Sequence, residues 1–186
     1  MASKLFLLPF FLFLSQLLLL LLLQPQPFVK ADTKLIRQTC KNTKYYNLCY
    51  SSLKSNPTSP NADPKGLAVI MVQIGRANAT ATSSYLSSKL VGPSNDTVLN
   101  RVLKECSEKY GYASEALQAS LQDLNNEEYD YAYMRVTAAS DYPNVCHNAF
   151  KRYPSLVYPS EISRREKDLK HICDVALGII DNLWNN

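Results

Sequence analysis

The sequence predicts an all-α protein, built as an up-down-up-down four-helix bundle with an N-terminal α-helical hairpin extension and two disulfides. Glycine is scarce, with five in 186 residues, and apolar residues recur at spacings of three and four, which is the period of a helix packed on one side. Four long segments of this kind follow one another through short connections. Short connections place consecutive helices antiparallel, as in a bundle.

The first 31 residues are typical of a secretory signal peptide. A nearly unbroken apolar run extends from Leu5 to Leu23, residues 24–27 (Gln-Pro-Gln-Pro) end it, and small residues precede a predicted cleavage after Ala31. The run is also long enough to cross a bilayer, so an uncleaved membrane anchor is the alternative. We expect cleavage, which leaves residues 32–186 as one domain with no remaining membrane segment.

Within that domain, residues 32–61 form the predicted hairpin and residues 62–186 the bundle. Two short helical patterns lie around 35–39 and 45–54. The first long helix starts at Asp63-Pro64, because Asp can cap a helix and Pro suits its first position. Its predicted inward stripe consists of Leu67, Ile70, Met71, Ile74, Ala77, Ala81, Tyr85 and Leu90.

Gly92 and Pro93 are expected to end that helix, and Ser94 or Asn95 to cap the next. After a short connection at 125–126, the third long helix is predicted from about Glu127 and the fourth from 160–161. The predicted inward residues of these helices are Val98, Val102, Cys106, Tyr110, Ala113, Leu117, Leu121 and Leu124; then Tyr133, Val136, Ala139 and Cys146; then Ile162, Leu169, Ile172, Cys173, Ala176, Ile180 and Leu183.

All five cysteines lie after residue 31, and an oxidising compartment favours disulfides among them. Spacing alone does not fix the pairing. Cys40 and Cys49 flank the step between the two hairpin helices, and Cys106 and Cys146 lie at similar distances from the turn at 125–126. Both of these pairings are feasible, and they leave Cys173 as a buried free thiol.

Composition and motifs point away from catalysis and from nucleic acids. Loss of residues 1–31 removes two lysines and no acids, so the net charge falls from +4 to +2, too even a balance for nucleic-acid binding. There is no phosphate-binding glycine loop and no Gly-x-Ser-x-Gly elbow. His147 and His171 lack partners at ligand spacing, so we predict no metal, no cofactor and no enzyme.

Three further groups of residues are singled out. The acids Asp123, Glu127, Glu128 and Asp130 surround a helix start, where negative charge is favourable. Tyr129, Tyr131 and Tyr133 alternate, so one helix cannot bury all three, and at least one should be available for binding. Two Asn-x-Thr sequons predict N-glycosylation at Asn78 and Asn95.

The chain resembles the plant inhibitors of invertase and of pectin methylesterase. The resemblance lies in the signal peptide, the segment Thr39-Cys40-Lys41-Asn42-Thr43, a second cysteine nine residues after the first, and the cysteines at 106 and 146. It covers residues 32–186. The segments 53–57, 65–68, 129–132 and 141–146 are most similar to the branch called cell-wall and vacuolar inhibitors of fructosidase.

This resemblance implies the bundle with its hairpin, disulfides Cys40–Cys49 and Cys106–Cys146, and a one-to-one complex that blocks the active site of an acid invertase. Similar inhibitors often carry Pro-Lys-Phe near the start of the third long helix, and this motif enters the target cleft. Here the corresponding residues are Tyr129, Asp130 and Tyr131, which with Glu128 are the expected target contacts. Aspartate in place of lysine reverses a charge.

Pectin methylesterase is the alternative target, since Cys173 also resembles the equivalent cysteine of that inhibitor branch. A carrier of small apolar ligands is a third, less favoured interpretation, because the continuous aliphatic stripes leave little room for a cavity. We expect a protein that is monomeric when free and is secreted to the apoplast, the cell wall or the vacuole.

Overall fold

The computed structural model describes residues 33–90 and 96–184, so the predicted signal peptide and the break at 92–93 lie outside the described residues. Within these two ranges the structure is helical and has no strand, and no helix is long and apolar enough to cross a membrane. The elements are α2 (Thr33–Lys41), α3 (Tyr46–Ser55), the 3₁₀ turn η1 (Ser59–Asn61), α4 (Pro64–Leu90), α5 (Thr97–Asn125), α6 (Tyr129–Lys151) and α7 (Ser160–Trp184).

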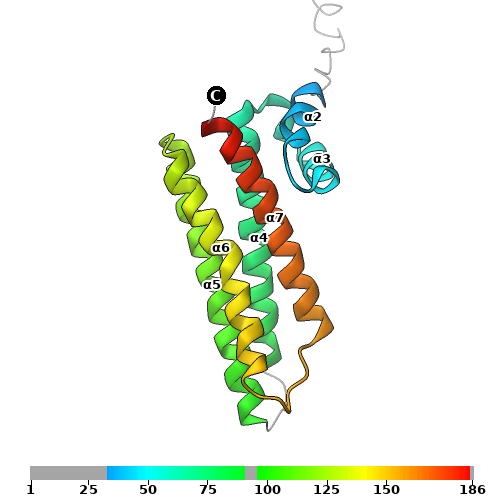
Figure 1. Ribbon diagram of the computed structural model, residues 1–186, viewed down its shortest axis with the longest axis vertical. Helices are drawn as coiled ribbons and strands as arrows, with labels where there is room; N and C mark the ends of the chain where they lie inside the picture. The colour runs from blue at the N-terminus through cyan, green and yellow to red at the C-terminus, as the bar shows by residue number, and fades with distance from the viewer. Residues whose placement is uncertain (1–32, 91–95, 185–186) are drawn as a thin grey trace, which may run out of the picture. The chain divides into compact units, whose positions relative to one another are not determined.

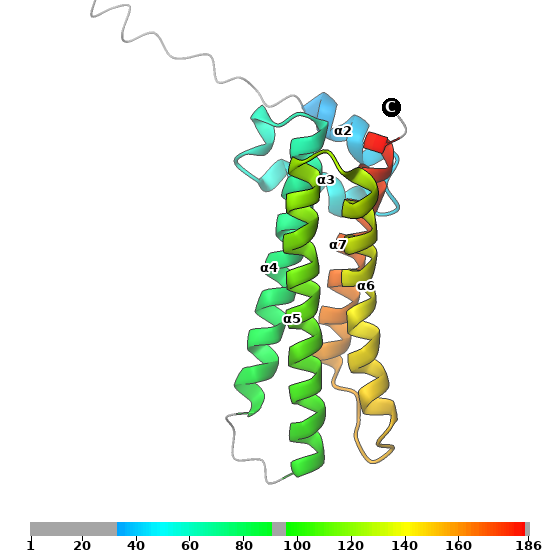
Figure 2. The same cartoon turned by 90° about the vertical axis from the view of Figure 1, so that its left-hand side faces the viewer.

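The four long helices form the predicted bundle, alternating in direction (Figure 1). α4 packs against α5 and α7, and α6 closes the ring by packing against the same two helices. Figure 2 shows α5 between α4 and α6. The short helices α2 and α3 pack against each other and against α4 and α7. The predicted fold class is therefore confirmed, with the α5–α6 turn at the same end of the bundle as the start of α4.

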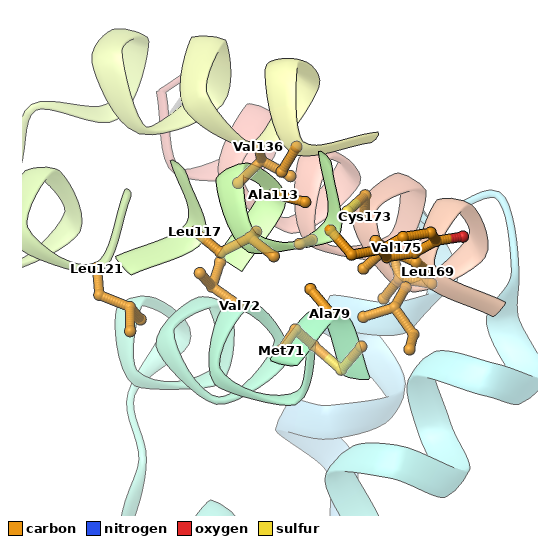
Figure 3. Close-up of a cluster of buried hydrophobic side chains, with 14 of the residues drawn as sticks. Met71, Val72, Ala79, Ala113, Leu117, Leu121, Val136, Leu169, Cys173 and Val175 are labelled. Carbon is orange, nitrogen blue, oxygen red and sulfur yellow. The ribbon is translucent and has the colours of Figure 1, made fainter. Parts of the chain in front are cut away.

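The core of the bundle receives side chains from all four long helices (Figure 3). Met71, Leu117, Val136 and Leu169 come from four different helices, and each is at most 1% exposed. A Cβ atom at Gly75 would lie only 3.3 Å from Ile172 Cγ2 and 3.5 Å from Leu117 Cδ1. A glycine at this position lets α4 lie close to Leu117 of α5 and Ile172 of α7, which explains a glycine inside a helix.

The predicted inward stripe of α4 is wrong at two positions. Ala77 and Ala81 are exposed, whereas Ala79 and Thr82 are buried. α4 contacts α5, α7 and α3, so it buries a wider and differently centred face than a helix with a single apolar stripe. Small residues are compatible with either face, and the neighbours decide which of them are covered.

Two predicted helix starts also differ from the structure. The N-cap of α5 is Asp96, whose carboxylate accepts hydrogen bonds from the backbone N–H groups of Val98 and Leu99, each at 3.0 Å. The sequence predicts this cap at residue 94 or 95 instead. α6 begins at Tyr129, two residues later than predicted, because residues 127 and 128 complete the end of α5.

Two disulfides brace the fold. Cys40–Cys49 links α2 to α3, and Cys106–Cys146 links α5 to α6. Cys173 is a free cysteine on α7 and is 1% exposed. Burial, with a smaller contribution from the negative charge of Asp174, raises the pKa of the Cys173 thiol to about 12. The thiol therefore stays protonated, and so weakly reactive, at physiological pH.

Candidate interaction site at the α5–α6 turn

The turn between α5 and α6 has the hydrogen bonds of a Schellman motif. The Glu127 N–H donates to the carbonyl of Leu124 at 3.1 Å, and the Glu128 N–H donates to the carbonyl of Asp123 at 2.9 Å. These two bonds satisfy carbonyl groups that the end of α5 would otherwise leave unpaired. The turn is therefore a defined structure rather than a loose connection.

Glu127 adopts an unusual backbone conformation in this turn. Its φ angle is +63°, and in the part of the chain that the structure describes it is the only residue other than glycine with a positive φ. A side chain in this left-handed region costs about 1–2 kcal/mol. The Schellman motif requires a left-handed residue at this position, usually glycine, and its two hydrogen bonds hold Glu127 in that conformation.

An ion pair ties the strained residue to the start of α4. Lys65 Nζ donates to Glu127 Oε1 at 2.9 Å. This hydrogen bond to the Glu127 carboxylate, which outweighs a lowering by burial, holds the pKa of Lys65 above its usual value. The turn is thereby connected to a third helix of the bundle.

A second ion pair connects the two helices that the turn joins. Arg135 Nε donates to Asp123 Oδ2 at 2.6 Å, and the hydroxyl of Ser120 donates to the carbonyl of Ala132 at 3.1 Å. Asp123 is only 8% exposed and lies in the last turn of α5, where the helix dipole disfavours a negative charge. Its predicted role at a helix start is wrong, and Arg135 is the partner that makes its burial tolerable.

The four predicted contact residues lie together at the start of α6. Glu128 occupies the N-cap position without a side-chain cap hydrogen bond, and Asp130 is exposed in the first turn. Tyr129 packs against the core, whereas Tyr131 is 54% exposed. One tyrosine therefore anchors the segment and another projects from it, as the alternation of the three tyrosines predicted.

An apolar side chain extends this exposed surface along α6. Met134 lies one turn after Tyr131 and is 65% exposed. Residues three apart are neighbours on a helix surface. The candidate site, called here the turn surface, consists of residues 128–131 and Met134.

Sequence reasoning missed Lys65 and Arg135, although these residues hold the turn surface in place. A signal for Arg135 is present in the sequence, because an aspartate near the end of a predicted helix calls for a basic partner across the following turn. No comparable local signal marks Lys65. It is 62 positions from Glu127, and only the antiparallel arrangement of α4 and α5 brings the two together.

The remaining singled-out residues lie elsewhere. Asn78 is in the middle of α4, and Asn95 lies outside the described residues. His171 stacks on Tyr45, and His147 stacks on Tyr158 near Glu166, at 3.4 Å between His147 Nδ1 and Glu166 Oε2. Among residues 33–90 and 96–184, no group of three His, Cys, Asp or Glu side chains is placed to hold a metal ion.

Comparison with known proteins assigns this chain to a family. The family model described as plant invertase/pectin methylesterase inhibitor matches residues 34–179. The chain belongs to this family. It is 54% identical, over 81% of this chain and 84% of the relative, to cell wall / vacuolar inhibitor of fructosidase 2 of Arabidopsis thaliana. It is 35% identical, over 83% of this chain and 71% of the relative, to pectinesterase inhibitor 28 of Oryza sativa subsp. japonica.

A solved structure supports the same assignment. A mutant form of a pectin methylesterase inhibitor from Arabidopsis superposes with a TM-score of 0.63, at 25% sequence identity and over 82% of this chain and 97% of that one. The family and the relatives compared here are inhibitors, which agrees with the prediction that this chain is not an enzyme. The family includes inhibitors of both enzyme classes that the sequence suggested.

Proposed function

We propose that this protein inhibits acid invertase, that is, cell-wall or vacuolar β-fructofuranosidase, through a one-to-one complex in which the turn surface occludes the active site. The enzyme class is supported by the 54% identity to a named inhibitor of fructosidase over most of both chains. The choice of surface is supported by one structural observation, the exposed side chains of Tyr131 and Met134 on a segment that turn hydrogen bonds and ion pairs hold in place.

The turn surface suits insertion into a cleft because it is held in shape before binding. Tyr131 projects from a helix whose first turn is fixed by the Schellman bonds, the Asp123–Arg135 pair and the Lys65–Glu127 pair. A tyrosine loses little side-chain entropy when it is immobilised, and a fixed backbone adds little further cost. Tyr131 is therefore the expected centre of the binding energy.

Glycosidase active sites contain a pair of carboxyl groups. The phenolic hydroxyl of Tyr131 can donate a hydrogen bond to such a carboxylate, and its ring can cover the apolar wall of the cleft. Asp130 adds a negative charge beside it, which is unfavourable next to a carboxylate. Asp130 therefore limits affinity or directs the turn surface to a target with a basic rim.

Substitution of Tyr131 tests the proposed contact. Tyr131→Ala should weaken inhibition of acid invertase by about tenfold or more, as expected when an interface hot spot is truncated. Tyr112→Ala is the matched control, since Tyr112 is a 44% exposed tyrosine in the middle of α5 and away from the turn. Unchanged inhibition by Tyr131→Ala, with the helical circular dichroism intact, would show that another surface makes the contact.

Charge reversal at Asp130 tests the electrostatic part. Asp130→Lys should tighten binding to invertase a few-fold, mainly through a faster association rate that is sensitive to salt. Glu115→Lys, an exposed acid in the middle of α5, makes the same change of net charge away from the turn surface. If both variants bind equally well, the effect comes from overall charge and not from a contact at Asp130.

Pectin methylesterase is the second candidate target, favoured by the rice pectinesterase inhibitor at 35% identity. Parallel titration of one invertase and one pectin methylesterase with the purified protein separates the two targets. An apolar-ligand carrier is less well supported, because a hollow of about 620 Å³ carries Lys44, Asn78 and Asp168 in its lining beside the apolar Leu48 and Ile172.

We also propose secretion, with cleavage after Ala31, and a monomeric free protein that acts in the apoplast, the cell wall or the vacuole. The name of the Arabidopsis relative, a cell wall / vacuolar inhibitor, supports these destinations without choosing between them. N-terminal sequencing of the secreted protein tests the cleavage site. Fusion of a fluorescent protein to the C-terminus, imaged in plasmolysed plant cells, separates the cell wall from the vacuole.

A further inference from the structure

A hollow of about 620 Å³ lies between the hairpin and the bundle. None of the residues that line it belongs to the turn surface. Residues 44–48 line it on the hairpin side, and Asp168, His171 and Ile172 line it from α7. Asn78, in the middle of α4, also lines it. Clefts that hold small organic molecules occupy roughly 300–1,000 Å³, so this hollow has room for one or two sugar residues.

The side-chain oxygen of Asn78 makes no hydrogen bond in the fold. This atom, Oδ1, is buried and has no hydrogen-bond partner within the described residues. A buried polar atom without a partner is destabilising, and asparagine is also a poor residue for a helix interior. Stability therefore does not explain asparagine at this position. A role of the amide other than stabilising the fold explains it.

We propose that Asn78 carries an N-linked glycan whose first sugar residue occupies this hollow and joins α3 to α4 and α7. The acceptor sequence is Asn78-Ala79-Thr80. In the transfer, the bond from sugar C1 to the phosphate oxygen of a lipid pyrophosphate donor breaks, and a bond from C1 to Asn78 Nδ2 forms. Nδ2 loses one proton, and the lipid pyrophosphate is the leaving group.

The transfer has to precede folding. In the folded protein Thr80 lies in a helix, and its hydroxyl shares a hydrogen bond of 2.8 Å with the hydroxyl of Ser114. Asn78 Oδ1 is shielded from solvent. After folding, the Thr80 hydroxyl is therefore engaged and one atom of the Asn78 amide is covered, as expected for modification during entry into the secretory pathway. The inference rests on the proposed secretion.

The lining of the hollow suits a neutral sugar. Tyr46 is 41% exposed and offers an aromatic face to the apolar face of a pyranose ring. Asn47, Asp168 and His171 carry donors and acceptors for hydroxyl and N-acetyl groups. His171 is itself held by stacking on Tyr45, with 3.9 Å between ring centroids. A sugar in this place contacts three helices at once and should slow the opening of the hairpin.

The experiment uses the full chain expressed through a eukaryotic secretory pathway, with glycopeptide mass spectrometry of Asn78 and hydrogen exchange of α3. Wild type and Thr80→Ser keep the acceptor sequence and should be modified. Asn78→Gln and Thr80→Ala should lose the glycan, and both should show amide exchange in α3 faster by several-fold. Asn95→Gln is the control, because it removes the other sequon and should leave α3 unchanged.

Three results would overturn the inference. An unmodified Asn78 in protein that has lost residues 1–31 contradicts the glycan alone. A modified Asn78 with equal exchange in all variants shows that the sugar lies outside the hollow. A chain retained in the cell with residues 1–31 contradicts secretion and the glycan together. The invertase assay separates this inference from the proposed inhibition, since loss of the glycan should leave inhibition by the turn surface unchanged.

Discussion

The hairpin and the bundle are stabilised in different ways. Each long helix of the bundle buries between seven and eleven residues, whereas α2 and α3 bury two each. In the hairpin these residues are Ile36, Cys40, Cys49 and Leu53, so half of them are the cysteines of one disulfide. Apolar packing therefore contributes more to the bundle, while the hairpin depends more on a covalent link and on docking against α4 and α7.

This difference predicts that two disulfides with similar chemistry have different effects on stability. Cys106–Cys146 joins two helices that already share an extensive apolar interface. Cys40–Cys49 joins two helices that are too short to be stable alone. The hairpin should therefore open locally while the bundle stays folded, since stability varies across a structure according to local packing.

A matched pair of leucines gives the largest expected effect. Leu117, in the bundle, is 1% exposed, and Leu53, in the hairpin, is 0% exposed. Leu117→Ala should lower the global free energy of unfolding by about 2–5 kcal/mol. Leu53→Ala should lower it less and should instead speed amide exchange in α2 and α3. Equal losses in urea denaturation, without local exchange, would mean that the hairpin and the bundle unfold as one unit.

Removal of each disulfide should give the next largest effects. The double substitution Cys106→Ala with Cys146→Ala should lower global stability by about 4 kcal/mol in the chain-entropy model. Cys40→Ala with Cys49→Ala corresponds to about 3 kcal/mol, but the loss should appear as undocking of the hairpin. Far-ultraviolet circular dichroism and hydrogen exchange distinguish the two. Cooperative loss of all helices after removal of Cys40–Cys49 would contradict this view of the hairpin.

The buried thiol of the bundle predicts a loss of stability in alkali. The pKa of Cys173 is about 12 in the folded protein, against about 8.5 for an exposed thiol. Because the pKa is raised in the folded protein, the contribution of the neutral Cys173 thiol to the free energy of unfolding is complete below about pH 8.5. It is lost as the pH rises toward 12.

Cys173→Ala removes the contribution of the buried thiol, and wild type is the comparison. The substituted protein should lose less stability than wild type between about pH 8.5 and pH 10, below the range in which exposed tyrosines ionise. Burial raises the pKa values of Tyr110 and Tyr158 as well, so they contribute only at higher pH. Parallel stability curves for the two proteins would show that the Cys173 environment does not disfavour the thiolate. Rapid alkylation of the native protein at pH 8 would show the same.

The ion pair between the hairpin and the bundle should have the smallest effect. Lys44 Nζ lies 2.9 Å from Asp174 Oδ2, and the Lys44 side chain is 66% exposed. The hydrogen bond to Asp174 raises the pKa of Lys44, but exposed pairs contribute little and are screened by salt. Lys44→Ala should slightly speed exchange in α3 at low salt and have no effect at high salt. A large change that persists in salt would point to packing by the lysine stem.

Local patterns determined most of the fold. Asp63 caps α4 as expected, with its carboxylate accepting from the Gly66 N–H at 2.7 Å. The inward stripes of α5 and α7 are buried almost as predicted, because both carry large aliphatic residues on one face. Helix caps, the apolar period and helix-ending residues such as proline act over a few residues. They can therefore be identified from a single sequence. The family resemblance added the target class, which no local pattern contains.

Tertiary structure decided the rest, including the geometry on which the turn surface depends. Arg135 and Lys65 reach their acidic partners only because three helices meet at one end of the bundle. Likewise, the hydroxyl of Tyr158 donates to Glu166 at 2.9 Å, and His147 lies beside the same carboxylate. The geometry of a helix fixes which of its residues lie on the same face. Only the packing of one helix on another selects the covered face, the partner of each buried charge and the surroundings of Asn78.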